Sequence, residues 1–227
     1  MNRLYRLDAL EFLQNQVEAR ELDGVFTDPP YPMDDLMNFG DSYTLVDWDY
    51  LQHVIFQLKV KLKVNAPLFW MSNLSNFRKT WETLENQGFQ VLNVIVWNKA
   101  PAGFSGHIAP GRNFLNACEF VFYAVNEEAE YIQPVQNLFN YIGKIPSHKL
   151  GPTTKPAQLV AHCLRSFDHL NATFCDPFAG SNPLLRAINM NYLQGNSITN
   201  ALVTGEEDPA MHSPDPEIGL FSRSWIQ

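Results

Sequence analysis

The chain has 227 residues, 45% hydrophobic and 18% charged, a balance typical of a folded domain with one sizeable core. Its net charge of −8 argues against a polybasic nucleic-acid binder but not against a nucleic-acid enzyme, because local charge matters more than the sum. The N-terminus is too charged for a signal peptide, and no apolar run approaches the roughly 20 residues of a membrane span.

Strands and helices are predicted to alternate along the chain. Short apolar runs bounded by turn residues predict strands, and apolar positions three or four residues apart predict helices. The predicted strands are Arg3–Leu7, Leu22–Thr27, Pro67–Met71, Val91–Trp97, Phe120–Val125, Thr173–Cys175 and one beginning at Tyr192–Leu193. The predicted helices are Ala9–Gln16 behind an Asp8 cap, Leu51–Val64, Asn76–Gln87 ending at Gly88, Pro156–Phe167 and Pro183–Asn191. The pattern predicts an α/β fold, a mostly parallel sheet with helices on both faces, whose ligands bind at the carboxyl ends of strands.

Two segments, Asn98–Asn116 and Phe139–Thr154, do not fit this alternation and are predicted to be long loops. Loops of that length in a compact domain are usually functional or disordered. The tail from Ala201 carries five acids and one base, which predicts a mobile acidic segment.

The three cysteines are far apart and have apolar neighbours, without the spacing of metal ligands. They are Cys118, Cys163 and Cys175. The pattern is typical of reduced core thiols in a cytosolic protein, and no metal site is expected.

The segment Asp28–Tyr31, with the sequence DPPY, directly follows a predicted strand. Its two prolines make a stiff turn, because they fix φ and lack a backbone N–H. The turn presents a carboxylate, unpaired carbonyls and an aromatic ring together. Such acceptors suit an exocyclic amine, since accepting both N–H bonds favours a more nucleophilic nitrogen. Tyr31 would stack on a base, which is worth roughly 1–3 kcal/mol. The simpler alternative is a plain strand-ending turn.

Two further segments are candidates for a cofactor site. Asp176–Ser181 lies between a predicted short strand and a helix, and Gly180 would let a ligand approach the backbone closely. Lys155–Leu159 opens a helix about twenty residues earlier, with Pro156 in its first turn. Taken singly, both are also compatible with ordinary turns and helix starts.

Taken together, these segments resemble the beta class of DNA amino-methyltransferases. In that family a catalytic DPPY segment is followed by a variable target-recognition region, a KPxxL helix and a DPFxGSG cofactor loop. Asp28–Tyr31, the loops between Asn98 and Leu150, Lys155–Leu159 and Asp176–Ser181 stand here in that order. Val96–Lys99 also resembles the family segment that lines the base pocket.

The resemblance implies a Rossmann-like methyltransferase domain over residues 1–200, with residues 98–150 as variable target-recognition loops and 201–227 as the tail. It implies that S-adenosylmethionine methylates the exocyclic amine of a base flipped out of DNA, at a flipping cost of a few kcal/mol. It also implies a cytoplasmic protein of a bacterial or phage-infected cell, and leaves open a homodimer and a restriction partner.

Roles for individual residues come with the resemblance. The catalytic residues would be Asp28, Pro29, Pro30 and Tyr31; the cofactor-binding residues would be Lys155, Pro156, Asp176, Pro177, Phe178, Ala179, Gly180, Ser181 and Asn196. Lys99, Arg112, His148 and Lys149 are the candidates for phosphate contacts, with a solvated surface charge as the alternative for each. Asp28 and the Pro29 carbonyl would hold the amine while Tyr31 stacks on the ring, so that catalysis is positioning and electrostatics. Asp rather than Ser at position 28 favours adenine N6 over cytosine N4.

The sequence departs from the family pattern at two places. Asn182 and Pro183 follow Ser181 where the family has Gly and then Thr or Ser; they suit a helix start, but the Asn182 side chain is expected to crowd the cofactor. The acid expected on the next strand to bind ribose is missing, and Asn196 or Ser197 is offered instead. Two alternatives therefore stand beside adenine methylation: cytosine N4 methylation, and a catalytically silent module that binds DNA or a protein.

Overall fold

The computed structural model describes residues 2–32, 46–98, 117–126, 140–143 and 155–200. Its strands are β1 (Arg3–Tyr5), β2 (Gly24–Thr27), β3 (Pro67–Ser72), β4 (Phe89–Asn98), β5 (Cys118–Asn126), β6 (Tyr141–Ile142), β7 (Thr173–Asp176) and β8 (Asn196–Asn200). Its helices are α1 (Ala9–Gln16), α2 (Trp48–Lys61), α3 (Phe77–Asn86), α4 (Ala157–Leu164) and α5 (Pro183–Asn189), with a 3-10 turn, η1 (Arg165–Phe167), after α4.

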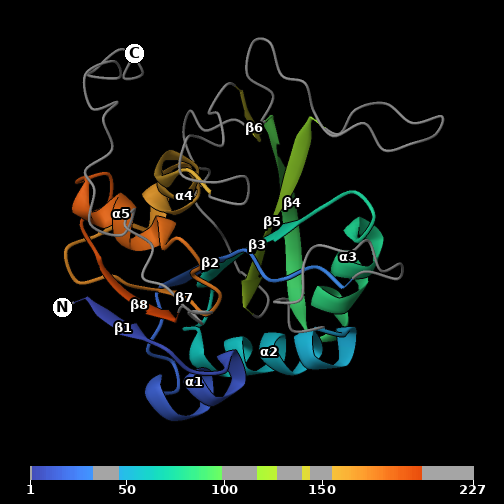
Figure 1. Ribbon diagram of the computed structural model, residues 1–227, viewed down its shortest axis with the longest axis horizontal. Coiled ribbons are helices and arrows are strands. Elements are labelled where there is room, and N and C mark those ends of the chain that lie inside the picture. Colours follow the sequence, from blue (N-terminus) through green and yellow to red (C-terminus); the bar gives the residue numbers. More distant parts are fainter. Residues whose placement is uncertain (1, 33–45, 99–116, 127–139, 144–154, 201–227) are drawn as a thin grey trace.

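The eight strands form one sheet in the order β1-β8-β7-β2-β3-β5-β4-β6 (Figure 1). All neighbouring pairs are parallel except those of β5, which runs antiparallel to both β3 and β4. The mostly parallel α/β sheet expected from the sequence is confirmed. Because β5 is reversed, its first residues lie beside the carboxyl end of β3, with Phe120 opposite Ser72.

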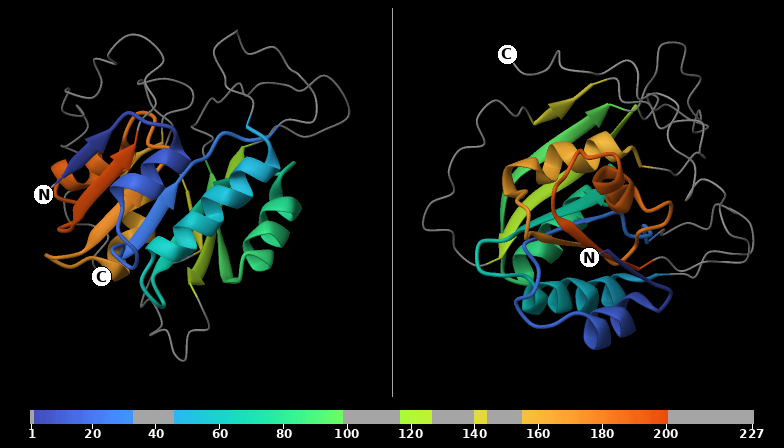
Figure 2. Two further views of the ribbon diagram at one scale, coloured as in Figure 1. Left: turned by 90° about the horizontal axis from the view of Figure 1, so that it is seen from below. Right: turned by 90° about the vertical axis from the view of Figure 1, so that its left-hand side faces the viewer.

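Helices cover both faces of the sheet (Figures 1 and 2). Apolar residues of α1, α2 and α3, such as Phe12, Ile55 and Leu84, form one core with Val25 of β2. Residues of α4 and α5, such as Leu159 and Leu184, form a second core with the neighbouring Phe26. Strand alternation sends Val25 and Phe26 to opposite faces, so the wholly buried β2 lies between two layers.

Two predicted helix ends, the start of α1 and the end of α3, are present in the structure. Asp8 Oδ1 accepts hydrogen bonds from the backbone N–H groups of Leu10 and Glu11 and caps α1. Gly88 follows α3 with a φ of 79°, a left-handed conformation that favours glycine. These short-range signals act within a few residues, which is why the sequence predicts them.

One predicted strand start was wrong by four residues and one strand was missed, whereas the other predicted strand limits differ by at most two residues. The last strand begins at Asn196 and not at Tyr192, because the N–H of Tyr192 still donates to Ala187 O at the end of α5. The long loop predicted over residues 139–154 contains β6, which pairs with β4; Val96 N donates to Asn140 O at 2.9 Å. Cys118 is exposed at the start of β5, whereas the other two cysteines are buried as expected.

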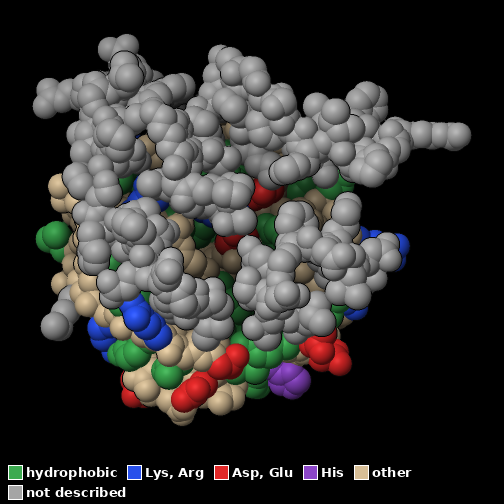
Figure 3. All heavy atoms as spheres, viewed as in Figure 1, with side chains coloured by type: hydrophobic (Ala, Val, Ile, Leu, Met, Phe, Trp, Pro, Cys, Tyr) green, Lys and Arg blue, Asp and Glu red, His purple; other side chains and the backbone are tan. Residues whose placement is uncertain are grey.

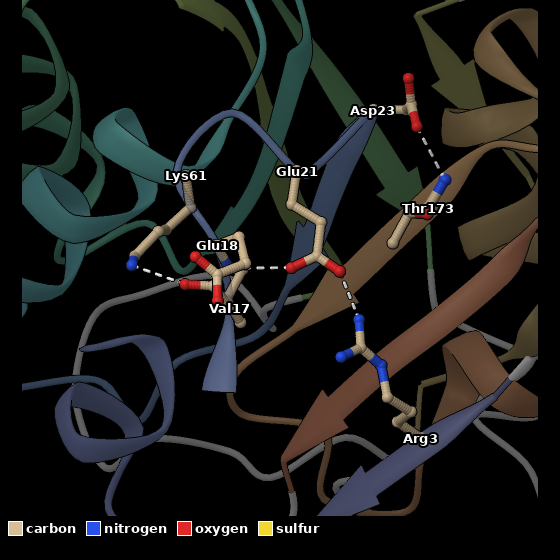
Figure 4. A network of polar contacts seen from close by, with 7 residues as sticks. All are labelled: Arg3, Val17, Glu18, Glu21, Asp23, Lys61 and Thr173. Carbon is tan, nitrogen blue, oxygen red and sulfur yellow. Dashed lines mark hydrogen bonds and ion pairs between the residues drawn. The ribbon is translucent and has the colours of Figure 1, made fainter. Parts of the chain in front are cut away.

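Polar contacts join segments at the amino ends of β2 and β7 (Figure 4). The carboxylate of Glu21 pairs with Arg3 and accepts the backbone N–H of Glu18. Asp23, just before β2, accepts the backbone N–H of Thr173 at 2.9 Å. These contacts secure backbone at the edge of the sheet opposite the predicted ligand site.

No helix in the described part of the chain is both long and apolar enough to cross a membrane.

Candidate active site at the carboxyl ends of β2 and β7

The Asp28 and Asp176 segments lie at the same edge of the sheet. β2 and β7 are parallel neighbours, with Val25 opposite Cys175, so the turns that follow them emerge side by side. Two segments almost 150 positions apart in sequence thereby meet where ligands of parallel sheets bind. This juxtaposition is the spatial arrangement that the predicted chemistry requires.

A buried hydrogen bond joins the two turns. Thr27 Oγ1, at the end of β2, donates to Asp176 Oδ1 at 2.8 Å, and the backbone N–H of Phe178 donates to the same oxygen at 3.1 Å. Asp176 is buried, and burial raises the pKa of its carboxyl to about 7, against the opposing effect of these two donors. The carboxylate fixes the shape of its own turn and its spacing from the Asp28 turn.

The Asp28 carboxylate has a partner on each oxygen. Tyr31 Oη donates to Oδ1 at 2.9 Å, and Lys155 Nζ lies 2.5 Å from Oδ2. The same ammonium lies 3.4 Å from Glu119 Oε2. Lys155 and Glu119 have side chains only 9% and 12% exposed, whereas Asp28 is 23% exposed. The cluster therefore opens toward solvent at Asp28, with the other two charges behind it.

The charged groups of this cluster alter one another's pKa. Burial raises the pKa of Asp28, Lys155 opposes that rise, and Glu119 adds to it. Burial alone would lower the pKa of Lys155, but the two carboxylates raise it above its ordinary value, so the ammonium stays charged. Burial also raises the pKa of Tyr31 well above its ordinary value, which keeps its hydroxyl a donor.

The sequence pointed to Lys155 as a site residue but not to Glu119. The resemblance assigned Lys155 to the cofactor, and the structure places its ammonium against Asp28, ahead of Pro156, the N-cap of α4. Glu119 was not singled out. Its signal was an acid directly before a run of apolar and aromatic residues, on the same strand face as Val121 and Tyr123.

The Asp176–Ser181 turn keeps its backbone accessible at one residue. Gly180 is exposed with a φ of 50°, and a Cβ added there would meet nothing nearer than Phe178 O at 3.9 Å. Pro177 and Ala179 are buried, and Ala179 N donates to Asn200 O at 2.9 Å. Phe178 and Ser181 are partly exposed. A ligand can thus approach the backbone at Gly180, while Pro177 and Ala179 are buried and hold the turn in place.

Asn182 directs its side chain into the protein. The residue is 2% exposed with a φ of 55°, its Oδ1 accepts Leu185 N at 3.2 Å, and its amide donates to Thr199 Oγ1 at 3.1 Å. The expectation that Asn182 caps α5 is confirmed. The side chain is committed to α5 and β8, so the structure gives no support to the expected crowding of the cofactor.

Asn196 is not brought to the Asp176 turn. It is the first residue of β8 and pairs with Thr173, whereas Thr199 lies opposite Asp176. Five strand residues place Asn196 about 13 Å from the carboxyl end of β8. Neutral side chains, Thr199 and Asn200, occupy that end, and Asn200 Nδ2 donates to Leu7 O and Pro177 O.

The candidate phosphate contacts lie outside the described residues: Lys99, Arg112, His148 and Lys149. On the face seen in Figure 3, acidic and basic side chains of the described residues are interspersed, and acidic ones are visible near its centre. Within residues 2–32, 46–98, 117–126, 140–143 and 155–200, no cluster of three or more His, Cys, Asp or Glu side chains could hold a metal ion.

Comparisons with known proteins agree on one family. A family model for DNA methylases of the N6/N4 class matches residues 22–193. Type II methyltransferase M2.LlaDCHI of Lactococcus lactis subsp. cremoris is 24% identical over 213 residues, covering 78% of this chain and 77% of that protein. The complex of M1.HpyAVI with S-adenosylmethionine superposes with a TM-score of 0.65 at 22% identity, covering 88% of this chain and 93% of that one. The structure of PvuII DNA methyltransferase, which is cytosine-N4-specific, superposes with a TM-score of 0.66 at 15% identity. The match covers 88% of this chain and 81% of that one.

Proposed function

The chain belongs to the DNA methylase family of the N6/N4 class, which uses S-adenosylmethionine to methylate amino nitrogens of DNA bases, and we propose that this member acts on adenine N6. The observation that carries the proposal is the Asp28 carboxylate, held at the end of β2 beside the Asp176 turn. An aspartate at this position, where a serine would favour cytosine N4, is the basis for adenine. The adjoining turns would bring the two reactants together.

The residues present fit the cofactor. Gly180 leaves room for a ligand against the backbone, and the partly exposed Phe178 ring offers an apolar surface. Asp176 and Ser181 supply polar groups on the same turn. S-adenosylmethionine, when bound, supplies a methyl group attached to a positively charged sulfur. The sulfur is a good leaving group because it departs as a neutral thioether. We assign its binding to residues 176–181 and expect Asn200, not Asn196, near the ribose, because only Asn200 lies at this edge.

Asp28 supplies the electrostatic part of the mechanism. A carboxylate offers about four acceptor positions, so Asp28 can accept an N–H of the base while Tyr31 and Lys155 occupy two of them. The nitrogen gains positive charge as its bond to the methyl carbon forms and the carbon–sulfur bond breaks, and a preorganised anion stabilises that charge. The bonding electron pair would leave with the sulfur, and the methylated nitrogen would afterwards release one proton to water.

Tyr31 and Pro29 complete the proposed base site. In the structure the Tyr31 hydroxyl donates to Asp28, so its ring is anchored beside the carboxylate. Stacking of a flipped base on that ring would contribute roughly 1–3 kcal/mol. The Pro29 carbonyl would accept the second N–H of the amine. The target-recognition role falls to residues 98–150, with Lys99, Arg112, His148 and Lys149 on phosphates.

A catalytically silent module is the alternative with a specific observation behind it. The described carboxyl end of β8 carries Thr199 and Asn200, and neither supplies the charge of the acid that the family uses for ribose. Neutral hydrogen bonds there would make cofactor binding weaker. The intact cluster around Asp28 favours the active enzyme.

The proposal is tested by incubating the full chain with unmethylated DNA and tritiated S-adenosylmethionine and analysing the nucleosides. Tritium in N6-methyladenine is the expected result. Tritium in N4-methylcytosine would move the substrate to cytosine. Absence of label, together with absence of cofactor binding in titration calorimetry, would establish the silent module and end the proposal.

A further inference from the structure

We propose that Glu119 is a positioning residue that shares the Lys155 ammonium with Asp28 and thereby keeps Asp28 available as an acceptor for the target amine. The inference rests on the proposed function, because it concerns the same carboxylate. Glu119 itself does not meet the base; it acts through Lys155. The second carboxylate is thereby part of the chemistry and not only a structural neighbour.

The geometry places the ammonium unequally between the two acids. Lys155 Nζ is 2.5 Å from Asp28 Oδ2 and 3.4 Å from Glu119 Oε2. The three groups come from separate places: the turn after β2, the first part of β5, and the residue before the N-cap of α4. The reversed direction of β5 is what brings Glu119 to this edge of the sheet.

Glu119 adds a second, largely buried carboxylate beside the same ammonium. These three side chains carry two negative charges and one positive charge, and burying a charge costs several kcal/mol unless partners compensate. One ammonium and one carboxylate would already form a neutral pair. An apolar residue at position 119 would match the rest of β5, where Phe120, Val121 and Phe122 follow.

The additional carboxylate changes what Asp28 can do. An ammonium bound only to Asp28 would draw electron density from it and weaken its attraction for an N–H. A second anion 3.4 Å away competes for the same ammonium and raises the electron density left on Asp28. When the amine becomes positive in the transition state, Lys155 can shift toward Glu119 while Asp28 attracts the amine.

Among the described residues, the charged and titratable groups that face Asp28 are Lys155, Glu119, Tyr31 and the more distant Asp176. Lys155 and the Tyr31 hydroxyl stabilise its ionised form, whereas Glu119 and burial destabilise it. Removing only the Glu119 charge therefore lowers the pKa of Asp28. Loosening of the site would also lower it, because Asp28 would lose burial, so the shift is assigned to the charge only when Glu119→Gln unfolds at the same temperature as the parent.

The test compares Glu119→Gln with the parent and with a matched control, Glu82→Gln. Glu82 pairs with Arg78 on the exposed face of α3, 47% exposed and away from the site. Glu119→Gln is expected to slow single-turnover methyl transfer about 10-fold to 100-fold, in the range of one lost electrostatic contact, and to move the acid limb of the rate profile to lower pH. Glu82→Gln is expected to leave both unchanged.

The same substitution made in a Lys155→Met variant shows whether Glu119 acts through Lys155. In Lys155→Met, adding Glu119→Gln is expected to cause no further loss of rate, because the shared charge is already absent. An equal loss in both backgrounds, or an acid limb that does not move in Glu119→Gln, would overturn the proposal.

A readout independent of activity separates this inference from the proposed function. The carboxyl carbon of Asp28, labelled with ¹³C and assigned by Asp28→Asn, is titrated by NMR in the parent and in Glu119→Gln. A lower pKa in the variant supports the proposal even in a chain that transfers no methyl group. An unchanged or higher pKa contradicts it even in an active enzyme.

Discussion

Two aspartates flank β2 and have opposite surroundings. Asp23, just before the strand, contacts Lys63 at 2.6 Å and accepts a backbone N–H from Thr173, and Lys63 is 48% exposed. Asp28, just after it, pairs with Lys155, which is 9% exposed. At the amino end, the carboxylate holds backbone in place and its lysine partner is open to water. At the carboxyl end, the carboxylate is itself held in place by a shielded lysine, and this end is where ligands of parallel sheets bind.

Breaking the two lysine pairs separately is expected to show the largest difference. Lys155→Met leaves two carboxylates without their shared cation in a buried place, which is expected to cost about 3–5 kcal/mol of unfolding free energy. Lys63→Met breaks a half-exposed pair and is expected to cost under about 1 kcal/mol. Urea denaturation at neutral pH measures both, and equal losses would show that burial does not distinguish the two ends.

The second prediction concerns the pH dependence contributed by Asp176, at the carboxyl end of β7. Its pKa is raised from 3.8 to about 7, so between these values the folded chain holds a proton that the unfolded chain has released. Stability from this group is complete below the lower value and is lost as pH rises through the upper one. The slope approaches about 1.4 kcal/mol per pH unit in that window.

Asp176→Asn removes that contribution. The unfolding free energy of the parent minus that of the variant is measured from pH 4 to 8 in the same buffers. This difference is expected to fall as the pH rises. Asp28 is present in both proteins, and only its Coulomb interaction with Asp176 fails to cancel in the difference. Parallel curves for the two proteins would show that Asp176 does not titrate in this window.

Phe178→Ala is expected to weaken S-adenosylmethionine binding about 10-fold, or about 1.4 kcal/mol, because the ring offers apolar surface on the cofactor turn. The matched control is Leu170→Ala, at the amino end of β7, where the side chain is exposed. Titration calorimetry checks both. Unchanged affinity in Phe178→Ala would remove this ring from the cofactor site.

Asn182→Gly is expected to have the smallest effect, a loss of about 1 kcal/mol of stability with little change in cofactor affinity, because its hydrogen bonds lie within the protein. Asn65→Gly, also at a positive φ but at the amino end of β3, controls for relief of the left-handed backbone. Thermal unfolding and calorimetry give the two quantities. A large gain in affinity in Asn182→Gly would mean that the asparagine does crowd the cofactor.

The parts of the fold that the sequence predicted depend on short-range physics. Asp8 and Asn182 cap helices because their side chains reach backbone N–H groups two or three residues on. β3 was recognised from its continuous apolar run, since a strand covered on both faces has no polar side. The adjacency of the Asp28 and Asp176 turns is a long-range contact, and the sequence indicated it only through the family resemblance and the binding of ligands at the carboxyl ends of parallel strands.

What the sequence did not predict depends on partners distant in the chain. β6 exists because β4 offers it hydrogen bonds, not because Tyr141 and Ile142 form a recognisable pattern. The start of β8 was misplaced because the turn after α5 continues through Tyr192. Glu119 reaches the site only because β5 runs antiparallel, and no local signal reveals strand direction.

The contrast between the two ends of β2 is tested most directly by single-turnover methyl transfer to DNA in Asp28→Asn and Asp23→Asn, measured with saturating tritiated S-adenosylmethionine. Asp28→Asn is expected to lower the rate at least about 100-fold with cofactor affinity retained, whereas Asp23→Asn stays within about threefold of the parent. Equal rates in Asp28→Asn and the parent, or an equal loss in both variants, would contradict a catalytic carboxylate at the carboxyl end of β2.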